Sequence, residues 1–188
     1  MKTSTMMNKL YFLFFALLII SCSEGDIIEF SVDDLNGDLE NCSNENDNTF
    51  VFFVIDQGIN RSLSLNFTDT SFEINPENVS DISIDEPTLI TLNATNNQFI
   101  YREFDTAING DEYFCNSIPV SGVNVTLELI STNGTADISY EAAEDQPDPT
   151  QTSYSRTVIL RDVTLEGGGI AIRKEILELG SDNISIPN

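Results

Sequence analysis

Short runs of apolar and β-branched residues, separated by Asn, Asp, Gly and Pro, fill most of the chain after residue 26. In Ser62–Phe67 and Val123–Leu129 every second residue is apolar, the pattern of a strand with one face in the core and one in water. Runs of this kind predict strands over Ile27–Leu35, Phe50–Ile55, Ser62–Phe67, Leu89–Leu92, Phe99–Phe104, Val123–Ile130, Ala136–Tyr140, Ser155–Thr164 and Gly169–Leu179. Such spacing predicts an all-β fold, an antiparallel β-sandwich of roughly eight to ten short strands.

The last of these runs also fits a helix, since Ile172, Ile176 and Leu179 could line one helical face. We predict a strand there, because Gly167-Gly168-Gly169 makes a natural turn back from the preceding run and so favours a long terminal hairpin. The acidic, proline-containing stretch 144–150 predicts a long loop or a hinge.

The first 21 residues have the layout of a secretory signal. Lys2 and Lys9 supply a positive flank, and Leu10–Ile20 is an uninterrupted apolar run of 11 residues. A helix that crosses a bilayer needs about 20 apolar residues, so this run is too short for a stable membrane anchor. We therefore expect residues 1–21 to be removed.

The end of this signal, Ile19-Ile20-Ser21-Cys22, resembles the lipobox of bacterial lipoproteins. The resemblance implies cleavage before Cys22 and acylation of Cys22, and two or more acyl chains anchor a protein stably. The following Ser23-Glu24-Gly25-Asp26 resembles the short acidic signals that send lipoproteins of Bacteroidota to the outside of the outer membrane. The chain is similar to uncharacterised flavobacterial lipoproteins, which implies an outer-membrane location on the cell surface, with the periplasmic face as the alternative.

The expected organisation has three parts: a signal peptide over 1–21, a lipidated acidic tether over 22–30 and the β-sandwich domain over 31–188. Without the signal peptide the chain keeps 6 Lys and Arg against 31 Asp and Glu, a formal charge of −25. Such a chain repels phosphate, so we expect no nucleic-acid partner and no membrane contact except through the lipid. The charge does not prevent folding, because 40% of the residues are hydrophobic.

Two cysteines remain once Cys22 carries lipid. The signal directs the chain to an oxidising compartment, so we predict a disulfide between Cys42 and Cys115. A zinc site is a poor competitor, because the chain has no His and two thiolates rarely complete such a site. A catalytic thiol would lack the His that activates it.

The absence of His also removes the serine–histidine nucleophile systems and the commonest general base. We therefore expect a non-catalytic domain that binds a protein, a glycan or an envelope component. The alternative is a small hydrolase, similar to a glycosidase, that uses two of the many carboxylates. Inward-facing acids clustered in a deep cleft would favour the hydrolase, and an exposed apolar patch would favour the binding domain.

Calcium is the one cofactor that the acidic segments suggest. Asp33–Glu40 places carboxylate and amide oxygens close together, which a hard cation prefers. The glycine of this segment has the wrong offset for an EF-hand loop, so we expect a solvated acidic turn with weak calcium binding at most. No other cofactor and no metal ligand is predicted.

Overall fold

The computed structural model describes residues 35, 37–44, 49–56, 58, 60–68, 76, 79–116, 118 and 120–188. The chain from Ser31 to Asn188 forms one compact unit. The predicted signal peptide, Cys22 and all but the last residue of the predicted strand Ile27–Leu35 lie outside the described residues. Within the described part of the chain, no helix has the length and the apolar character that crossing a membrane requires.

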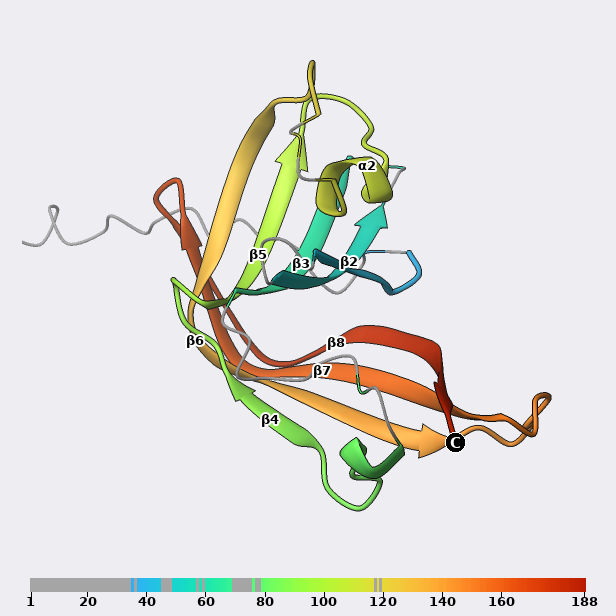
Figure 1. The fold of residues 1–188 in the computed structure, drawn as a ribbon. Helices are drawn as coiled ribbons and strands as arrows, with labels where there is room; N and C mark the ends of the chain where they lie inside the picture. The colour runs from blue at the N-terminus through green and yellow to red at the C-terminus, as the bar shows by residue number, and fades with distance from the viewer. Residues whose placement is uncertain are drawn as a thin grey trace, which may run out of the picture. The chain divides into compact units, whose positions relative to one another are not determined.

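The described residues hold eight strands, one 3₁₀-helix and one short α-helix (Figure 1). The elements are β1 (Glu40–Asn44), β2 (Thr49–Asp56), β3 (Arg61–Phe67), η2 (Val79–Asp81), β4 (Thr88–Thr91), β5 (Asn97–Phe104), α2 (Gly110–Phe114), β6 (Val125–Ala142), β7 (Gln151–Gly167) and β8 (Ile170–Pro187). The stretch 144–150, predicted as a long loop or a hinge, lies in the connection between β6 and β7.

All eight strands belong to one antiparallel sheet, in the order β1-β2-β3-β5-β6-β7-β8, with β4 paired to β6. The all-β antiparallel prediction is therefore confirmed. The division into two sheets that defines a sandwich is not confirmed, because one continuous hydrogen-bonded ladder joins every described strand. The sheet curls, so that β1 and β8, at opposite ends of this order, meet through a hydrogen bond of 2.7 Å from Asn41 Nδ2 to Asp182 Oδ2.

The strand predictions differ from the structure in three respects. The strands were predicted to be short, but β6, β7 and β8 have 18, 17 and 18 residues, and β8 continues past the predicted end at Leu179 to Pro187. The runs Val123–Ile130 and Ala136–Tyr140 are parts of the single strand β6, because Gly134, at φ 123°, lies in a bulge that bends the strand without ending it. The short polar strand β1 was not predicted, since only its pairing with β2 makes it a strand. Cys42 therefore lies within a strand.

The predicted terminal hairpin is confirmed, and the helical alternative for its second arm is wrong. β7 ends at Gly167 and β8 begins at Ile170. The two residues between them, Gly168 and Gly169, have φ of 57° and 79°. Two consecutive positive φ angles are what a tight two-residue hairpin turn requires, and glycine adopts them without a steric penalty.

The main core fills the concave side of the curled sheet, which we term the inner face. The register places Leu65 between Phe52 and Phe99, and it pairs Tyr101 with Leu129. These five side chains are buried. Further fully buried side chains of β6 and β7 are Ile138, Val158, Leu160 and Leu165. The alternating apolar positions of Ser62–Phe67 therefore line this core, whereas of those in Val123–Leu129 only Leu129 is buried, and Val125 is 41% exposed.

One charged residue lies inside this core. Arg156 is 0% exposed and forms a two-pronged ion pair with Asp182 on the neighbouring strand, with Nε 2.9 Å from Oδ1. Its guanidinium also lies 4.6 Å from the ring centroid of Phe52, a cation–π distance. Burial raises the pKa of the nearby Tyr140, and the positive charge of Arg156 partly offsets that rise. The pair therefore links β7, β8 and β1 through the core.

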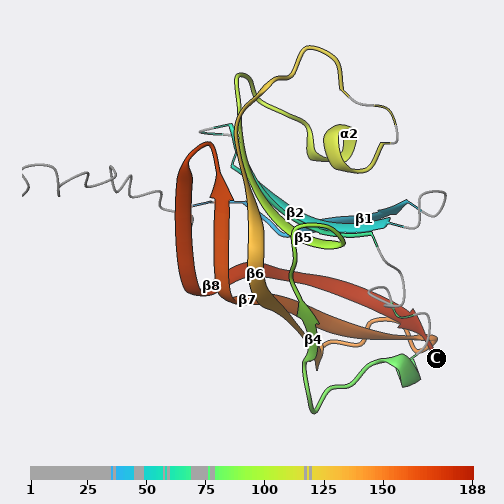
Figure 2. The same cartoon turned by 90° about the vertical axis from the view of Figure 1, so that its left-hand side faces the viewer.

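The opposite side of the same strands, which we term the outer face, has a smaller core beneath α2 (Figure 2). Phe53, Ser64 and Ile100 lie side by side on β2, β3 and β5 and are buried. The prediction that one face of Ser62–Phe67 lies in water is wrong, because Ser62 and Ser64 are also buried. Their hydroxyls make the outer face less apolar than the inner one. Oγ of Ser62 has no hydrogen-bond partner among the described residues.

Candidate functional site

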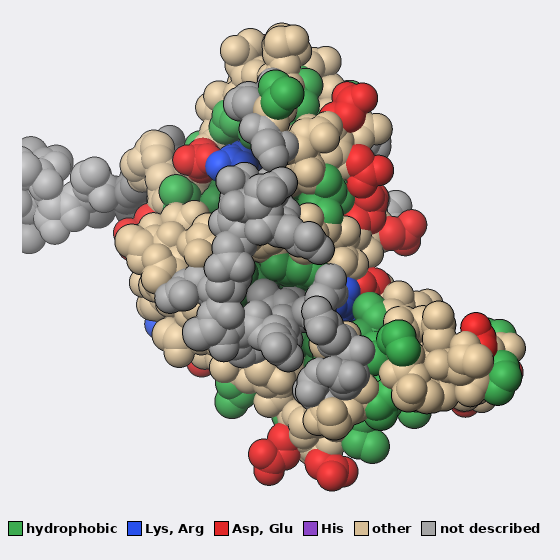
Figure 3. Space-filling model, in the orientation of Figure 1, with side chains coloured by type: hydrophobic (Ala, Val, Ile, Leu, Met, Phe, Trp, Pro, Cys, Tyr) green, Lys and Arg blue, Asp and Glu red, His purple; other side chains and the backbone are tan. Residues whose placement is uncertain are grey.

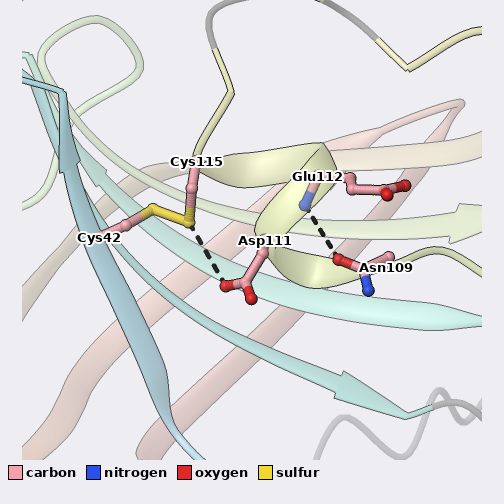
Figure 4. Close-up of a disulfide and its surroundings, with 5 residues drawn as sticks. All are labelled: Cys42, Asn109, Asp111, Glu112 and Cys115. Atoms are coloured by element: carbon pink, nitrogen blue, oxygen red, sulfur yellow. Dashed lines mark hydrogen bonds between the residues drawn. A yellow bond between two sulfur atoms is a disulfide. The ribbon is translucent and has the colours of Figure 1, made fainter.

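A disulfide fastens α2 to the outer face. It joins Cys42 of β1 to Cys115, the residue after α2, with a Cα–Cα distance of 5.7 Å and a sequence separation of 73 (Figure 4). The predicted pairing is thus supported by the structure. A disulfide that closes so long a loop restricts the unfolded chain strongly.

Local sequence explains why a helix forms at Gly110–Phe114. Asn109 has extended backbone angles, and its side chain accepts a hydrogen bond of 3.0 Å from the backbone N–H of Glu112. An N-cap of this kind satisfies one of the free donors at a helix start, and Asp111 and Glu112 suit the positive end of the helix. The backbone N–H of Cys115 closes the other end on the carbonyl of Asp111 at 3.1 Å.

Aromatic rings seat this helix on the sheet. Phe114 stacks on Phe53 with ring centroids 4.7 Å apart, and Tyr113 meets Phe104 edge to face at 5.1 Å. Gly110 is required at the contact, because a Cβ there would lie 2.5 Å from Cε2 of Phe53. The helix therefore covers Phe53, a buried aromatic residue on the convex side of the curled sheet.

Carboxylates gather around the disulfide. Glu40 lies two residues before Cys42 on β1, and Oδ1 of Asp111 lies 3.9 Å from Sγ of Cys115. Desolvation raises the pKa of Glu40, and the charges of Asp111 and Asp38 raise it further. Figure 3 shows acidic side chains gathered on the side of the molecule that carries α2. This part of the surface is negatively charged.

An open depression of about 530 Å³ lies beside the helix. Its described lining is Glu112, Asn116, Ile118 and Val120, which we term the helix surface. Ile118 is 79% exposed, more than any other large apolar side chain in the described part of the chain. Ile118 thus offers apolar area at a concave feature of the surface.

The structure brings together only some of the predicted site residues. Cys22 lies outside the described residues, so its lipidation stays a prediction. Of the calcium candidate Asp33–Glu40, the structure describes residue 35 and residues 37–40. Across the described ranges, no group of three or more Cys, Asp or Glu side chains has a metal-binding arrangement. Weak calcium binding therefore also stays a prediction.

Four carboxylates of the sheet form close ion pairs with arginines. Ion pairs join Glu103 to Arg61, Glu128 to Arg102, Asp182 to Arg156 and Asp137 to Arg161. A glycosidase needs one carboxyl group that keeps its proton, which requires a raised pKa. Glu40, with its raised pKa, comes nearest to that need, but it is exposed on the outer face.

Sequence reasoning did not find the helix surface. Ile118 stands alone between polar residues and Pro119, so it forms no periodic pattern. A usable signal was present nearby, because Tyr113 and Phe114 directly precede a cysteine expected in a disulfide. Such a segment must pack against the core, which leaves the next apolar residue at the rim.

No family model matches this chain, and neither the curated proteins nor the solved structures hold a match to it.

Proposed function

We propose that this protein is a lipid-anchored domain of the outer membrane, displayed on the cell surface, and that it binds a protein, a glycan or an envelope component through the helix surface. The lipobox-like Ile19-Ile20-Ser21-Cys22 and the acidic residues after it support the location. The single observation that carries the binding role is Ile118, which is exposed at the open depression beside a helix clamped by a disulfide.

The geometry of the helix surface supports binding more than hydrolysis. A clamped helix presents its neighbouring side chains in a fixed arrangement, so less conformational entropy is lost when a partner binds. Exposed Ile118 can supply buried apolar area, while Glu112 and Asn116 offer acceptors at the rim.

Acylation tests the location. In cells that express the full chain with a Cys22→Ala substitution, radiolabelled palmitate should no longer enter the protein, and the protein should leave the membrane fraction. Continued labelling of the variant would contradict the lipobox. Protease added to intact cells should degrade the wild-type domain, and complete protection would place it on the periplasmic side.

Site-specific photo-crosslinking tests the surface. We expect a photoreactive amino acid in place of Ile118 to give a defined adduct in intact cells. The same amino acid in place of Leu89, which is 63% exposed on β4, is the matched control. Equal adducts at both positions, or none at position 118, would contradict the proposed surface. Identifying the adduct would also distinguish a protein from a glycan.

A further inference from the structure

The disulfide sulfurs lie directly beside a carboxylate. Figure 4 shows the side chain of Asp111 directed toward the sulfur of Cys115, at 3.9 Å, whereas the side chain of Glu112 points away. A sulfur atom in a disulfide carries no hydrogen, so this contact sets a negative charge against the sulfur without a conventional hydrogen bond. Glu40 and Cys42 lie two residues apart on β1 and therefore share a face of the strand.

We propose that Asp111 and Glu40 form an electrostatic shield that slows reduction of the Cys42–Cys115 disulfide by anionic thiols, so that α2 stays latched to the outer face in their presence. This device goes beyond the proposed binding role and does not depend on it. Its basis is the placement of the carboxylates relative to the sulfurs, together with the charge of the attacking group.

Reduction proceeds by two exchange steps. A thiolate attacks one sulfur, forms a mixed disulfide and expels the other cysteine as a thiolate, which takes a proton from water. A second reductant thiolate then attacks the reductant sulfur of the mixed disulfide and releases the bound cysteine as a thiolate, which also takes a proton from water. The two reductant molecules leave joined by a disulfide. The protein gains two electrons and two protons, and two reductant thiols are oxidised to one disulfide.

Asp111 opposes both possible first steps. Attack on Cys115 brings the incoming anion next to the Asp111 carboxylate. Attack on Cys42 instead develops the leaving negative charge on Cys115, which is again next to Asp111. Glu40 adds a like charge on the side of Cys42. Since charges of the same sign repel at short range, the barrier rises on either route, most of all for an attacking group that carries extra negative charge.

The consequence of opening the latch follows from the packing of α2. The helix has five residues, too few to be stable without its tertiary contacts. Once the disulfide is open, only its ring contacts and neighbouring packing hold it over Phe53. Reductants without extra negative charge should therefore release the helix faster than anionic thiols do.

The test is the rate of reduction of the purified full chain in detergent by three thiols. The thiolate of glutathione is doubly negative, that of 2-mercaptoethanol is singly negative, and that of cysteamine has no net charge. Rates are corrected for thiolate fraction and divided by the rates for a small neutral disulfide. We expect Asp111→Asn to speed reduction by glutathione about fivefold, reduction by 2-mercaptoethanol less, and reduction by cysteamine least. Glu40→Gln should shift the rates in the same order.

The matched control is Asp145→Asn, which removes one charge in the connection between β6 and β7 and should leave all three corrected rates unchanged. High salt should speed reduction of the wild type by glutathione without any substitution, because it screens exposed charges. Equal effects of Asp111→Asn and Asp145→Asn would overturn the shield, as would equal acceleration with all three thiols. Two titratable thiols in the unreduced protein would remove its basis.

Discussion

The two faces of β2, β3 and β5 are built from neighbouring residues but are stabilised in different ways. On the inner face, Phe52, Leu65 and Phe99 are fully buried, and Arg156 of β7 lies against the ring of Phe52. On the outer face, Phe53 is covered by a five-residue helix that a disulfide joins to β1. The strands are thus buried on both sides, but among the described residues only the outer side has a covalent cross-link.

The reason lies in the amount of apolar area on each side. Burial stabilises by about 25 cal/mol per Å² of apolar surface. The inner face combines large side chains from many strands, whereas the outer face includes the buried hydroxyls of Ser62 and Ser64 and the half-buried Phe114. A disulfide compensates for a small core, as it does in small secreted domains. The inner core, by contrast, encloses the ion pair of Arg156 and Asp182 without a covalent cross-link between its described residues.

The largest effect should come from the inner face, at Arg156. Arg156→Ala leaves Asp182 without its partner in a low-dielectric site. Removing one member of a buried pair costs about 3–5 kcal/mol. We expect a loss of this size in the free energy of unfolding, measured by urea denaturation.

The double variant Arg156→Met with Asp182→Leu sharpens this prediction. It removes both charges, so most of the stability should return. A single variant that unfolds at the same urea concentration as the wild type would show that the pair contributes nothing.

The next effect should come from the clamp of the outer face. Cys42→Ser and Cys115→Ser should each lower the free energy of unfolding by about 2–4 kcal/mol, because either one opens the same long loop. The double variant should add little, since the second substitution removes no further cross-link. Thermal unfolding followed by circular dichroism measures all three. Additive losses would mean that the two cysteines act separately.

A smaller effect should follow at the ring stacked on the outer face. Phe114→Ala should cost about 1–2 kcal/mol, because the side chain is only half-buried. In the double cysteine variant the same substitution should cost less, since an unlatched helix already packs poorly. An unchanged cost in that background, measured by urea denaturation, would show that the helix holds its place without the disulfide.

The smallest effect should be a pH dependence at Glu40. Its raised pKa means that the folded protein binds this proton more tightly than the unfolded chain does. The contribution of Glu40 to the free energy of unfolding therefore falls as the pH rises from the ordinary pKa of 4.5 toward the raised pKa. The loss persists at higher pH. Glu40→Gln should raise the free energy of unfolding at neutral pH by less than about 0.5 kcal/mol, since the group is largely solvent-screened. The gain should vanish in acid. A gain that is the same at both pH values would exclude ionisation as its cause.

The strands with strong alternation could be predicted from the sequence. The strand Ser62–Phe67 and the turn at Gly168 and Gly169 follow from local patterns, so they could be recognised without any tertiary contact. The cysteine pairing was also predictable, because the expected acylation of Cys22 left only two cysteines. The burial of Arg156 could also have been predicted in principle, since alternation places it on the same face of β7 as the apolar residues Tyr154 and Val158.

What the sequence by itself determined is therefore the all-β class, most strand positions, the closing hairpin and the pairing of two cysteines, because neighbouring residues or simple counting carry that information. Only the tertiary structure decided that the strands form one curled sheet, that β6 runs through its bulge at Gly134, and that α2 covers Phe53. These features depend on contacts between residues far apart in the chain, and alternation specifies which side of a strand is apolar without specifying what will cover it.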